Sequence, residues 1–123
     1  MAKKILIVDD EPNIVVSLEF LLKREGFEIA LAGDGEEALA RVKTFQPDLL
    51  LLDVMMPKKS GFEVCEALRA DPAQTAPLIL MLTAKGRDTE IAKGLAIGAD
   101  AYMTKPFSTK ELVAKVKELL GVA

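Results

Sequence analysis

Four short runs of apolar residues each end in polar residues that can take part in chemistry. In chain order, the runs and the residues that end them are 5–8 with Asp9 and Asp10, 49–52 with Asp53, 78–82 with Thr83, and 101–104 with Lys105 and Pro106. Short apolar runs between polar residues are typical of strands that are buried on both faces. If the four strands are parallel, their ends meet at one edge of a sheet and bring three carboxylates, a hydroxyl and an ammonium group together.

Segments with apolar residues at helical spacing separate these strands. The expected helices run from Pro12 towards Gly26, from Asp34 to Phe45, from Ser60 to Leu68, from Asp88 to Ile97 and from Ser108 to Leu120, and a weaker strand is expected at 28–31. Ser60 with Glu63, and Ser108 with Glu111, have the spacing of a capping box, and Asp34 is placed to cap the second helix. A polar loop is expected between the third helix and the run at 78–82.

The alternation of strands and helices predicts one domain over residues 1–123 with an α/β fold of the (βα)5 type. Right-handed crossovers then give a doubly wound, five-stranded parallel sheet of the flavodoxin-like kind. The most apolar strands belong in the centre, so 28–31 and 101–104 are placed at the edges and the expected order is 2-1-3-4-5. In such a sheet a ligand binds beyond the carboxyl ends of the strands, at the switch point between the first and third strands.

Composition excludes several classes of function. The chain has 123 residues, half of them apolar, and a net charge of −3, which does not favour nucleic-acid binding. It contains no histidine, and its single cysteine, Cys65, is expected to be a buried apolar-like residue rather than a reactive thiol. No segment is long and apolar enough to span a membrane, and the run of four apolar residues after Lys3 and Lys4 is too short for a secretory signal. We therefore expect a cytoplasmic protein.

The three carboxylates predict a site for a hard cation. Neighbouring carboxylates repel one another, and a bound cation is the functional way to compensate. Oxygen ligands without histidine or a second cysteine favour Mg²⁺ over zinc, and Mn²⁺ would also fit. A divalent ion and Lys105 would balance the charge of Asp9, Asp10 and Asp53. With Thr83 as a hydrogen-bond donor, this set suits phosphoryl transfer in which Asp53 is the nucleophile.

Each of these residues also has a plain structural interpretation. Asp9 or Asp10 alone would stabilise the N-terminus of the following helix, and Asp53 would cap the next loop. Thr83 would be a turn residue, and Lys105 a solvated charge. The convergence of all of them at one edge favours a functional site over these separate interpretations.

At this point the chain resembles the receiver domain of bacterial two-component response regulators, and in extent it is similar to the single-domain chemotaxis members. The resemblance covers nearly the whole sequence. Its marks are the segments 8–11 (Val-Asp-Asp-Glu), 53–57 (Asp-Val-Met-Met-Pro) followed by Gly61, 83–84 (Thr-Ala), 98–100 (Gly-Ala-Asp) and 105–107 (Lys-Pro-Phe).

The resemblance implies that Asp53 is the phosphoacceptor for a phosphoryl group carried on a histidine of a sensor kinase or a phosphotransfer protein. It implies that Asp10, Asp53 and the backbone carbonyl of Met55 bind Mg²⁺ directly and that Asp9 acts through a coordinated water. The protein would then be a phosphoacceptor that catalyses its own phosphorylation and slow dephosphorylation, rather than an enzyme with a separate substrate.

The resemblance also implies how the phosphoryl group is held and sensed. Lys105 would contact it, positioned by a cis peptide before Pro106. Thr83 would move towards it, and the backbone N–H groups of Met55 and Ala84 would donate to it. Tyr102 would turn inward as Thr83 moves.

That movement would change the surface formed by the fourth helix, the fifth strand and the fifth helix, which would control a downstream protein. Gly94 lies inside the fourth helix, where it indicates either a weakly held, movable helix or a close packing contact. Relatives that dimerise through this surface use charged residues there. Asp100, Lys110, Glu111 and Lys115 partly match, but Ala101 stands where an acid is common, so both a monomer and a dimer remain open.

Three other functions are weighed against the receiver interpretation. A Mg²⁺-dependent phosphohydrolase with an aspartyl nucleophile usually has a second aspartate two residues later, where this chain has Met55. A flavin-binding protein of the same fold would need phosphate donors where Asp9, Asp10 and Glu11 would repel a phosphate. A scaffold that is never phosphorylated would not need the complete acidic set. The kinase, the downstream target, the lifetime of the phosphoryl group and any further domain beyond residue 123 are left open.

Overall fold

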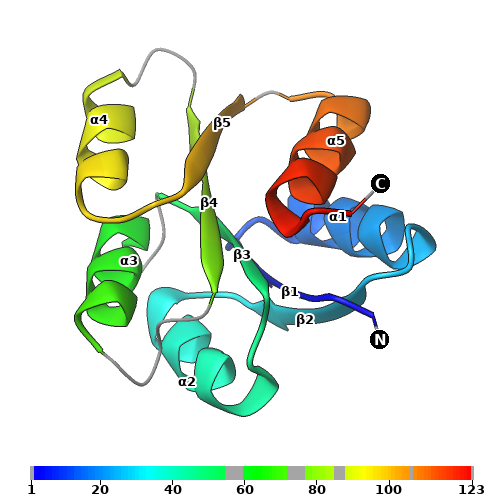
Figure 1. Cartoon of the computed structure of the whole chain (residues 1–123), viewed down its shortest axis with the longest axis horizontal. Helices are drawn as coiled ribbons and strands as arrows, with labels where there is room; N and C mark the ends of the chain where they lie inside the picture. Colours follow the sequence, from blue (N-terminus) through cyan, green and yellow to red (C-terminus); the bar gives the residue numbers. More distant parts are fainter. Residues whose placement is uncertain (1, 55–59, 72–76, 85–87, 106, 123) are drawn as a thin grey trace.

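Five parallel strands form one sheet in the order β2-β1-β3-β4-β5, as the sequence predicts (Figure 1). This computed structural model describes residues 2–54, 60–71, 77–84, 88–105 and 107–122. The strands are β1 Lys4–Val8, β2 Glu28–Ala32, β3 Leu49–Asp53, β4 Leu78–Ala84 and β5 Ala101–Lys105. The two strands with the weakest apolar patterns, β2 and β5, are the edge strands, because the centre of a doubly wound sheet is covered on both faces.

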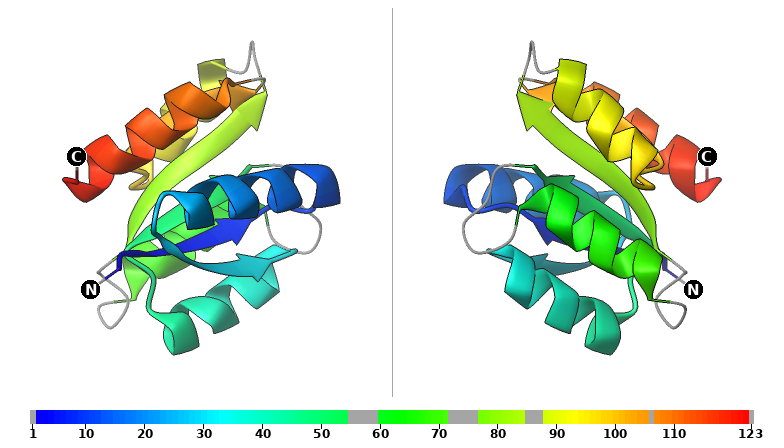
Figure 2. Two further views of the ribbon diagram at one scale, coloured as in Figure 1. Left: turned by 90° about the vertical axis from the view of Figure 1, so that its right-hand side faces the viewer. Right: turned by 90° about the vertical axis from the view of Figure 1, so that its left-hand side faces the viewer.

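Helices cover both faces of the sheet. They are α1 Pro12–Arg24, α2 Gly35–Phe45, α3 Gly61–Ala70, α4 Asp88–Ala96 and α5 Thr109–Leu120. Figure 2 shows α1 and α5 towards the viewer on one side and α3 and α4 on the other, and α2 lies on the same face as α3. Among the described residues, no helix is long and apolar enough to cross a membrane.

Side chains of alternating residues in the central strands pack into two separate apolar cores, one on each face of the sheet. In β1, Ile5 and Ile7 belong to the cluster under α1 and α5, whereas Leu6 and Val8 belong to the cluster under α2 and α3. This alternation follows from the two-residue period of a strand. Because both faces are buried, the runs at 5–8 and 49–52 are apolar throughout, which is why the sequence shows them as continuous runs.

The predicted helix caps are present. The Asp34 carboxylate accepts a hydrogen bond from the Glu37 N–H, and the Ser108 hydroxyl accepts one from the Glu111 N–H. At the start of α3, the Ser60 hydroxyl accepts from the Glu63 N–H while the Glu63 carboxylate accepts from the Ser60 N–H. These local bonds satisfy backbone groups that a helix start otherwise leaves without partners.

Arg69 ties together three segments at the end of the sheet opposite the polar edge. Its guanidinium donates to the carbonyl oxygens of Gly98 and Pro77, each at 2.9 Å, and to the Asp100 carboxylate at 2.8 Å. The same Asp100 oxygen accepts the Ile79 N–H at 2.8 Å. The end of α3, the start of β4 and the segment before β5 are therefore held by one side chain.

Candidate functional site

The polar residues that end the apolar runs lie at the carboxyl ends of adjacent strands. The observed strands extend one or two residues further than the sequence predicts, so Asp53, Thr83 and Lys105 lie within β3, β4 and β5 instead of following them. Asp53 pairs with Leu82, and Ala84 pairs with Lys105. Backbone pairing therefore fixes the positions of these side chains, which loops would leave less well defined.

The three carboxylates converge as the sequence predicts. One oxygen from each of Asp9, Asp10 and Asp53 lies within 4.8 Å of the others. Asp9 is 2% exposed and Asp53 is 5% exposed, whereas Asp10 is open to solvent. A cation at this point would thus be reached from the Asp10 side. The division of the three acids into direct and water-mediated metal ligands stays a prediction.

The Lys105 ammonium lies among the acids. Its Nζ is 3.1 Å from Asp9 Oδ2, 3.4 Å from Asp53 Oδ1 and 3.8 Å from Glu11 Oε1. Burial by itself lowers the pKa of Lys105, but the hydrogen bond with Asp9 and the negative charges of Asp53, Asp9 and Glu11 outweigh it, so the pKa lies above its usual value. Lys105 is therefore a fixed positive charge at neutral pH and not a solvated one.

Asp9 has two roles at once. Besides its contact with Lys105, its Oδ1 accepts the Glu11 N–H at 2.9 Å, directly before α1. The plain interpretation of Asp9, as an acid at the start of a helix, is thus compatible with the functional one. Glu11 was not among the predicted site residues. Its signal in the sequence is its place in the acidic segment 8–11, directly after Asp9 and Asp10.

The predicted sensing residues lie in adjacent strands. Thr83 is 3% exposed and pairs with Thr104, while Tyr102 pairs with Met81 and has an exposed side chain. The structure therefore buries Thr83 beside the acids and leaves Tyr102 at the surface. The backbone of Ala84 lies at the end of β4. The predictions for Met55 and for the peptide bond before Pro106 concern residues outside those that the structure describes.

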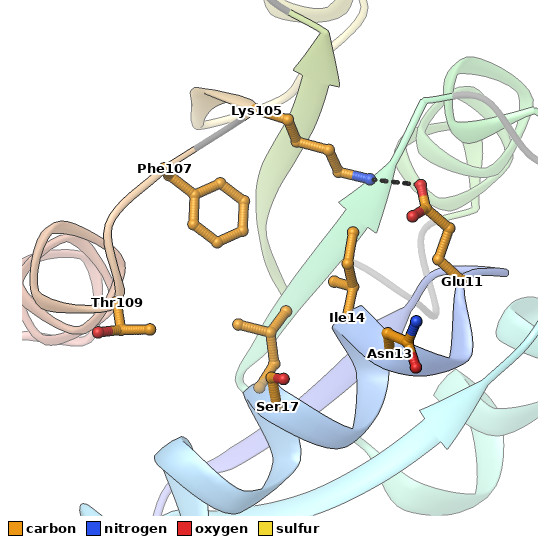
Figure 3. A pocket seen from close by; sticks show the side chains of 8 residues that line it. Glu11, Asn13, Ile14, Ser17, Lys105, Phe107 and Thr109 are labelled. Carbon is orange, nitrogen blue, oxygen red and sulfur yellow. Dashed lines mark ion pairs between the residues drawn. The ribbon is translucent and has the colours of Figure 1, made fainter.

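An open groove of about 560 Å³ borders the acids (Figure 3). It lies between the first turns of α1 on one side and Lys105, Phe107 and the start of α5 on the other. Its lining residues are Glu11, Asn13, Ile14, Ser17, Leu18, Lys105, Phe107 and Thr109. Glu11 and Lys105 both line the groove, and Lys105 also contacts Asp9 and Asp53, so a molecule seated there would lie next to the candidate site.

The donor set fits a hard divalent cation. All three converging ligands are carboxylate oxygens, which Mg²⁺ and Mn²⁺ accept readily. The chain has no histidine, and Cys65 is buried in the α2–α3 core and away from the three acids, as expected from the sequence. Lys105 already supplies one positive charge beside Asp9 and Asp53, and a divalent ion would compensate the negative charge that remains.

Comparison with known proteins decides the family. Residues 5–117 match the family described as the response regulator receiver domain. The chain belongs to this family. The receiver domain is 52% identical over 120 residues to the alkaline phosphatase synthesis transcriptional regulatory protein PhoP of Bacillus subtilis, covering 98% of this chain and 49% of that protein. It spans about half the length of the curated relatives it matches.

Solved structures agree with this receiver fold. A protein of Chloroflexus aurantiacus described as a response regulator superposes with a TM-score of 0.93 at 38% identity, covering 98% of this chain and 99% of that one. The chemotaxis protein CheY4 of Vibrio cholerae superposes with a TM-score of 0.90 at 33% identity, covering 97% and 99%. The resemblance inferred from the sequence motifs is confirmed at the level of family and fold.

Proposed function

We propose that this receiver domain takes a phosphoryl group onto Asp53 in a Mg²⁺-dependent reaction and thereby relays a signal to a partner protein. The observation that carries the proposal is the convergence of Asp9, Asp10 and Asp53 around the fixed charge of Lys105. A nucleophilic carboxylate, acidic metal ligands and a cation for the incoming phosphoryl oxygens are then in one place.

The proposed transfer is a displacement at phosphorus. An Asp53 carboxylate oxygen attacks the phosphorus of a phosphohistidine, and a new oxygen–phosphorus bond forms while the phosphorus–nitrogen bond breaks. The electron pair of the broken bond stays on the imidazole nitrogen, which takes up a proton from solvent. No general base is needed because a carboxylate attacks in its ionised form, which suits a chain without histidine.

The residues around Asp53 divide the remaining work. Lys105, which lies 3.4 Å from Asp53, would move from the carboxylate to a phosphoryl oxygen. Asp10, Asp53 and the Met55 carbonyl, with Asp9 through a water, would hold Mg²⁺, which would supply further positive charge against the phosphoryl oxygens. Thr83, buried in the neighbouring strand, would donate a hydrogen bond to the new group.

The surface beside the site supports a protein as the phosphodonor. On α1, next to the groove, Val16 is 64% exposed and Phe20 is 67% exposed, one helical turn apart. Exposed apolar side chains of this size favour a protein contact. We propose that the histidine-bearing domain of a sensor kinase or phosphotransfer protein docks over α1 and the groove, which would bring its phosphohistidine to Asp53.

The proposed output is the surface of α4, β5 and α5. Tyr102 lies exposed in β5, one strand away from Thr83, so a shift of Thr83 towards the phosphoryl group would be passed to this surface. The protein would act as a cytoplasmic switch with slow loss of the phosphoryl group. A downstream protein, or a second receiver domain, would read the change.

Intact-mass measurement after incubation with acetyl phosphate tests the proposal. We expect an added phosphoryl mass in the presence of Mg²⁺, little addition in EDTA, and none on the Asp53→Asn variant. Asp48, in the turn before β3, provides the matched control, because Asp48→Asn removes an acid that lies far from the site.

Equal labelling of wild type and Asp53→Asn would show that Asp53 is not the phosphoacceptor. Labelling at the same rate with and without Mg²⁺ would show that the reaction does not require the metal. Rapid multiple turnover of acetyl phosphate would instead identify a phosphohydrolase.

A further inference from the structure

The first residue of α3 lies directly against the backbone of Asp53. A Cβ atom built on Gly61 would overlap the Asp53 carbonyl oxygen and lie 2.9 Å from Val54 Cα. Both neighbours are backbone atoms, so they cannot rotate away as the end of a side chain would. Only glycine fits here without a shift of the chain that carries the phosphoacceptor.

A hydrogen bond fixes this approach. The Gly61 N–H donates to the Val54 carbonyl at 3.0 Å, and the Val54 N–H donates across the sheet to Leu82 at 3.1 Å. An N–H in the first turn of a helix has no acceptor within the helix. Here the carbonyl oxygen of Val54, the residue after Asp53, takes the place of that acceptor. The peptide groups around Asp53 are therefore held by β4 on one side and by α3 on the other.

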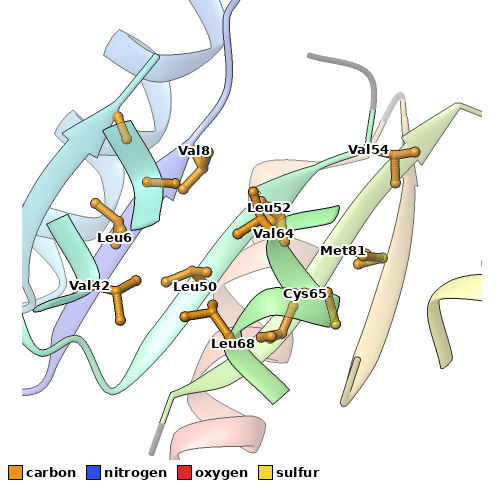
Figure 4. Close-up of a cluster of buried hydrophobic side chains, with 13 residues drawn as sticks. Leu6, Val8, Val42, Leu50, Leu52, Val54, Val64, Cys65, Leu68 and Met81 are labelled. Atoms are coloured by element: carbon orange, nitrogen blue, oxygen red, sulfur yellow. The ribbon is translucent and has the colours of Figure 1, made fainter. Parts of the chain in front are cut away.

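The rest of α3 makes this contact rigid. The reciprocal capping bonds of Ser60 and Glu63 fix the direction in which the chain enters the helix. Val64 and Cys65 are fully buried in the same core cluster as Val54 (Figure 4). Gly61 is thus pressed onto Asp53 by a helix that cannot easily lift off the sheet.

We propose that Gly61 is a positioning residue for phosphoryl transfer: its close approach sets the backbone of Asp53 and therefore where the Asp53 carboxylate points. The inference rests on the proposed function, since it concerns the same reaction. It adds to the segment 53–57 and Gly61 a structural requirement, namely that the first residue of α3 contacts the backbone of Asp53.

The test compares Gly61→Ala with Ser60→Ala. Both disturb the start of α3, but Ser60→Ala removes a cap without adding an atom near Asp53. We expect the rate of labelling by acetyl phosphate at saturating Mg²⁺ to fall on the order of tenfold or more in folded Gly61→Ala, because small misplacements of reacting groups are costly. Ser60→Ala should label at the wild-type rate. The amide resonances of Asp53 and Val54 should shift in Gly61→Ala alone.

If folded Gly61→Ala labels as fast as wild type, or if Ser60→Ala slows labelling equally, the inference is wrong. In case Gly61→Ala does not fold, amide hydrogen exchange of the wild-type protein decides. Gly61 should exchange nearly as slowly as Val54, and exchange as fast as an ordinary helix start would overturn the proposal. A wild-type protein that is not labelled at all would instead refute the proposed function, whatever the exchange of Gly61 shows.

Discussion

The ammonium group of Lys105 lies within 4 Å of three carboxylates of the site. Lys105 contacts Asp9 more closely than Asp53, at 3.1 Å against 3.4 Å, and Glu11 adds a third, more distant carboxylate. Asp9 and Asp53 are almost completely buried, so their charges would be poorly compensated without Lys105. A divalent cation bound by these acids would therefore compensate the same negative charges as Lys105.

Lys105→Met should destabilise the metal-free protein by about 2–3 kcal/mol at neutral pH, because it leaves buried carboxylates without their cation. Millimolar Mg²⁺ should stabilise this variant more than it stabilises wild type, since a bound cation replaces the lost charge. Urea unfolding followed by circular dichroism, with and without Mg²⁺, measures both effects. Lys110→Met, at an exposed lysine of α5, is the matched control and should change little.

The same variant gives a pH dependence with a defined sign. The pKa of Lys105 is raised in the folded protein, so its stabilising contribution is complete below the unfolded value of about 10.4 and is lost as pH rises through the folded value. The difference in unfolding free energy between wild type and Lys105→Met should be constant from neutral pH to about pH 10 and shrink above it. A difference that already shrinks near pH 8 would contradict the ion pairing.

At the scale of single elements, α4 rests on the sheet through a glycine. A Cβ on Gly94 would lie 2.6 Å from Met81 Sδ and 3.7 Å from a ring carbon of Phe62. Of the two interpretations that the sequence allows for Gly94, the structure supports the close packing contact. Lys93, the preceding residue, places its ammonium 4.6 Å from the centre of the Phe62 ring, so α4 also contacts α3 at this point.

Gly94→Ala should destabilise the protein by about 1 kcal/mol, because crowding against Met81 outweighs the gain in helix propensity. In the background of Met81→Ala, which removes the crowded side chain, the same substitution should be neutral or stabilising. A double-mutant cycle of unfolding free energies measures this coupling. Additive effects of the two substitutions would show that Gly94 does not act through Met81.

At the scale of the whole molecule, contacts between distant segments hold helices on both faces of the sheet. Arg69 joins α3 to the segments that lead into β4 and β5, through Pro77, Gly98 and Asp100. On the other face, Lys117 of α5 lies 2.8 Å from Glu25 after α1, and the hydrogen bond with Lys117 lowers the pKa of Glu25. The fold is held by such pairs in addition to its two apolar cores.

Arg69→Lys should recover little of the stability lost in Arg69→Met, because an ammonium cannot contact three acceptors that a planar guanidinium reaches together. We expect Arg69→Met to lose about 2 kcal/mol, since it leaves partly buried carbonyl groups without donors. Arg41→Met, at an exposed arginine of α2, is the control. Chemical denaturation of wild type and the three variants measures the differences in unfolding free energy. If Arg69→Lys is as stable as wild type, the planar arrangement of the guanidinium N–H donors does not matter here.

Local sequence signals account for most of the fold. Helix starts at Asp34, Ser60 and Ser108, the five strands and their order all follow from caps and from runs of apolar residues. The convergence of Asp9, Asp10 and Asp53 also follows, because parallel strands in adjacent positions bring their carboxyl ends together. The sequence pattern ends β2 to β5 one or two residues too early, since pairing with neighbouring strands, and not local pattern, decides where a strand stops.

The sequence by itself therefore determined which residues form the polar edge and which family the chain resembles. Only the tertiary structure decided how they touch: Lys105 meets Asp9 across 96 residues of chain, Glu11 joins them, and Gly61 presses on the backbone of Asp53. The reason is physical. Periodicity and capping act between neighbours in sequence, whereas close packing and charge pairing depend on distances that exist only once the helices cover the sheet.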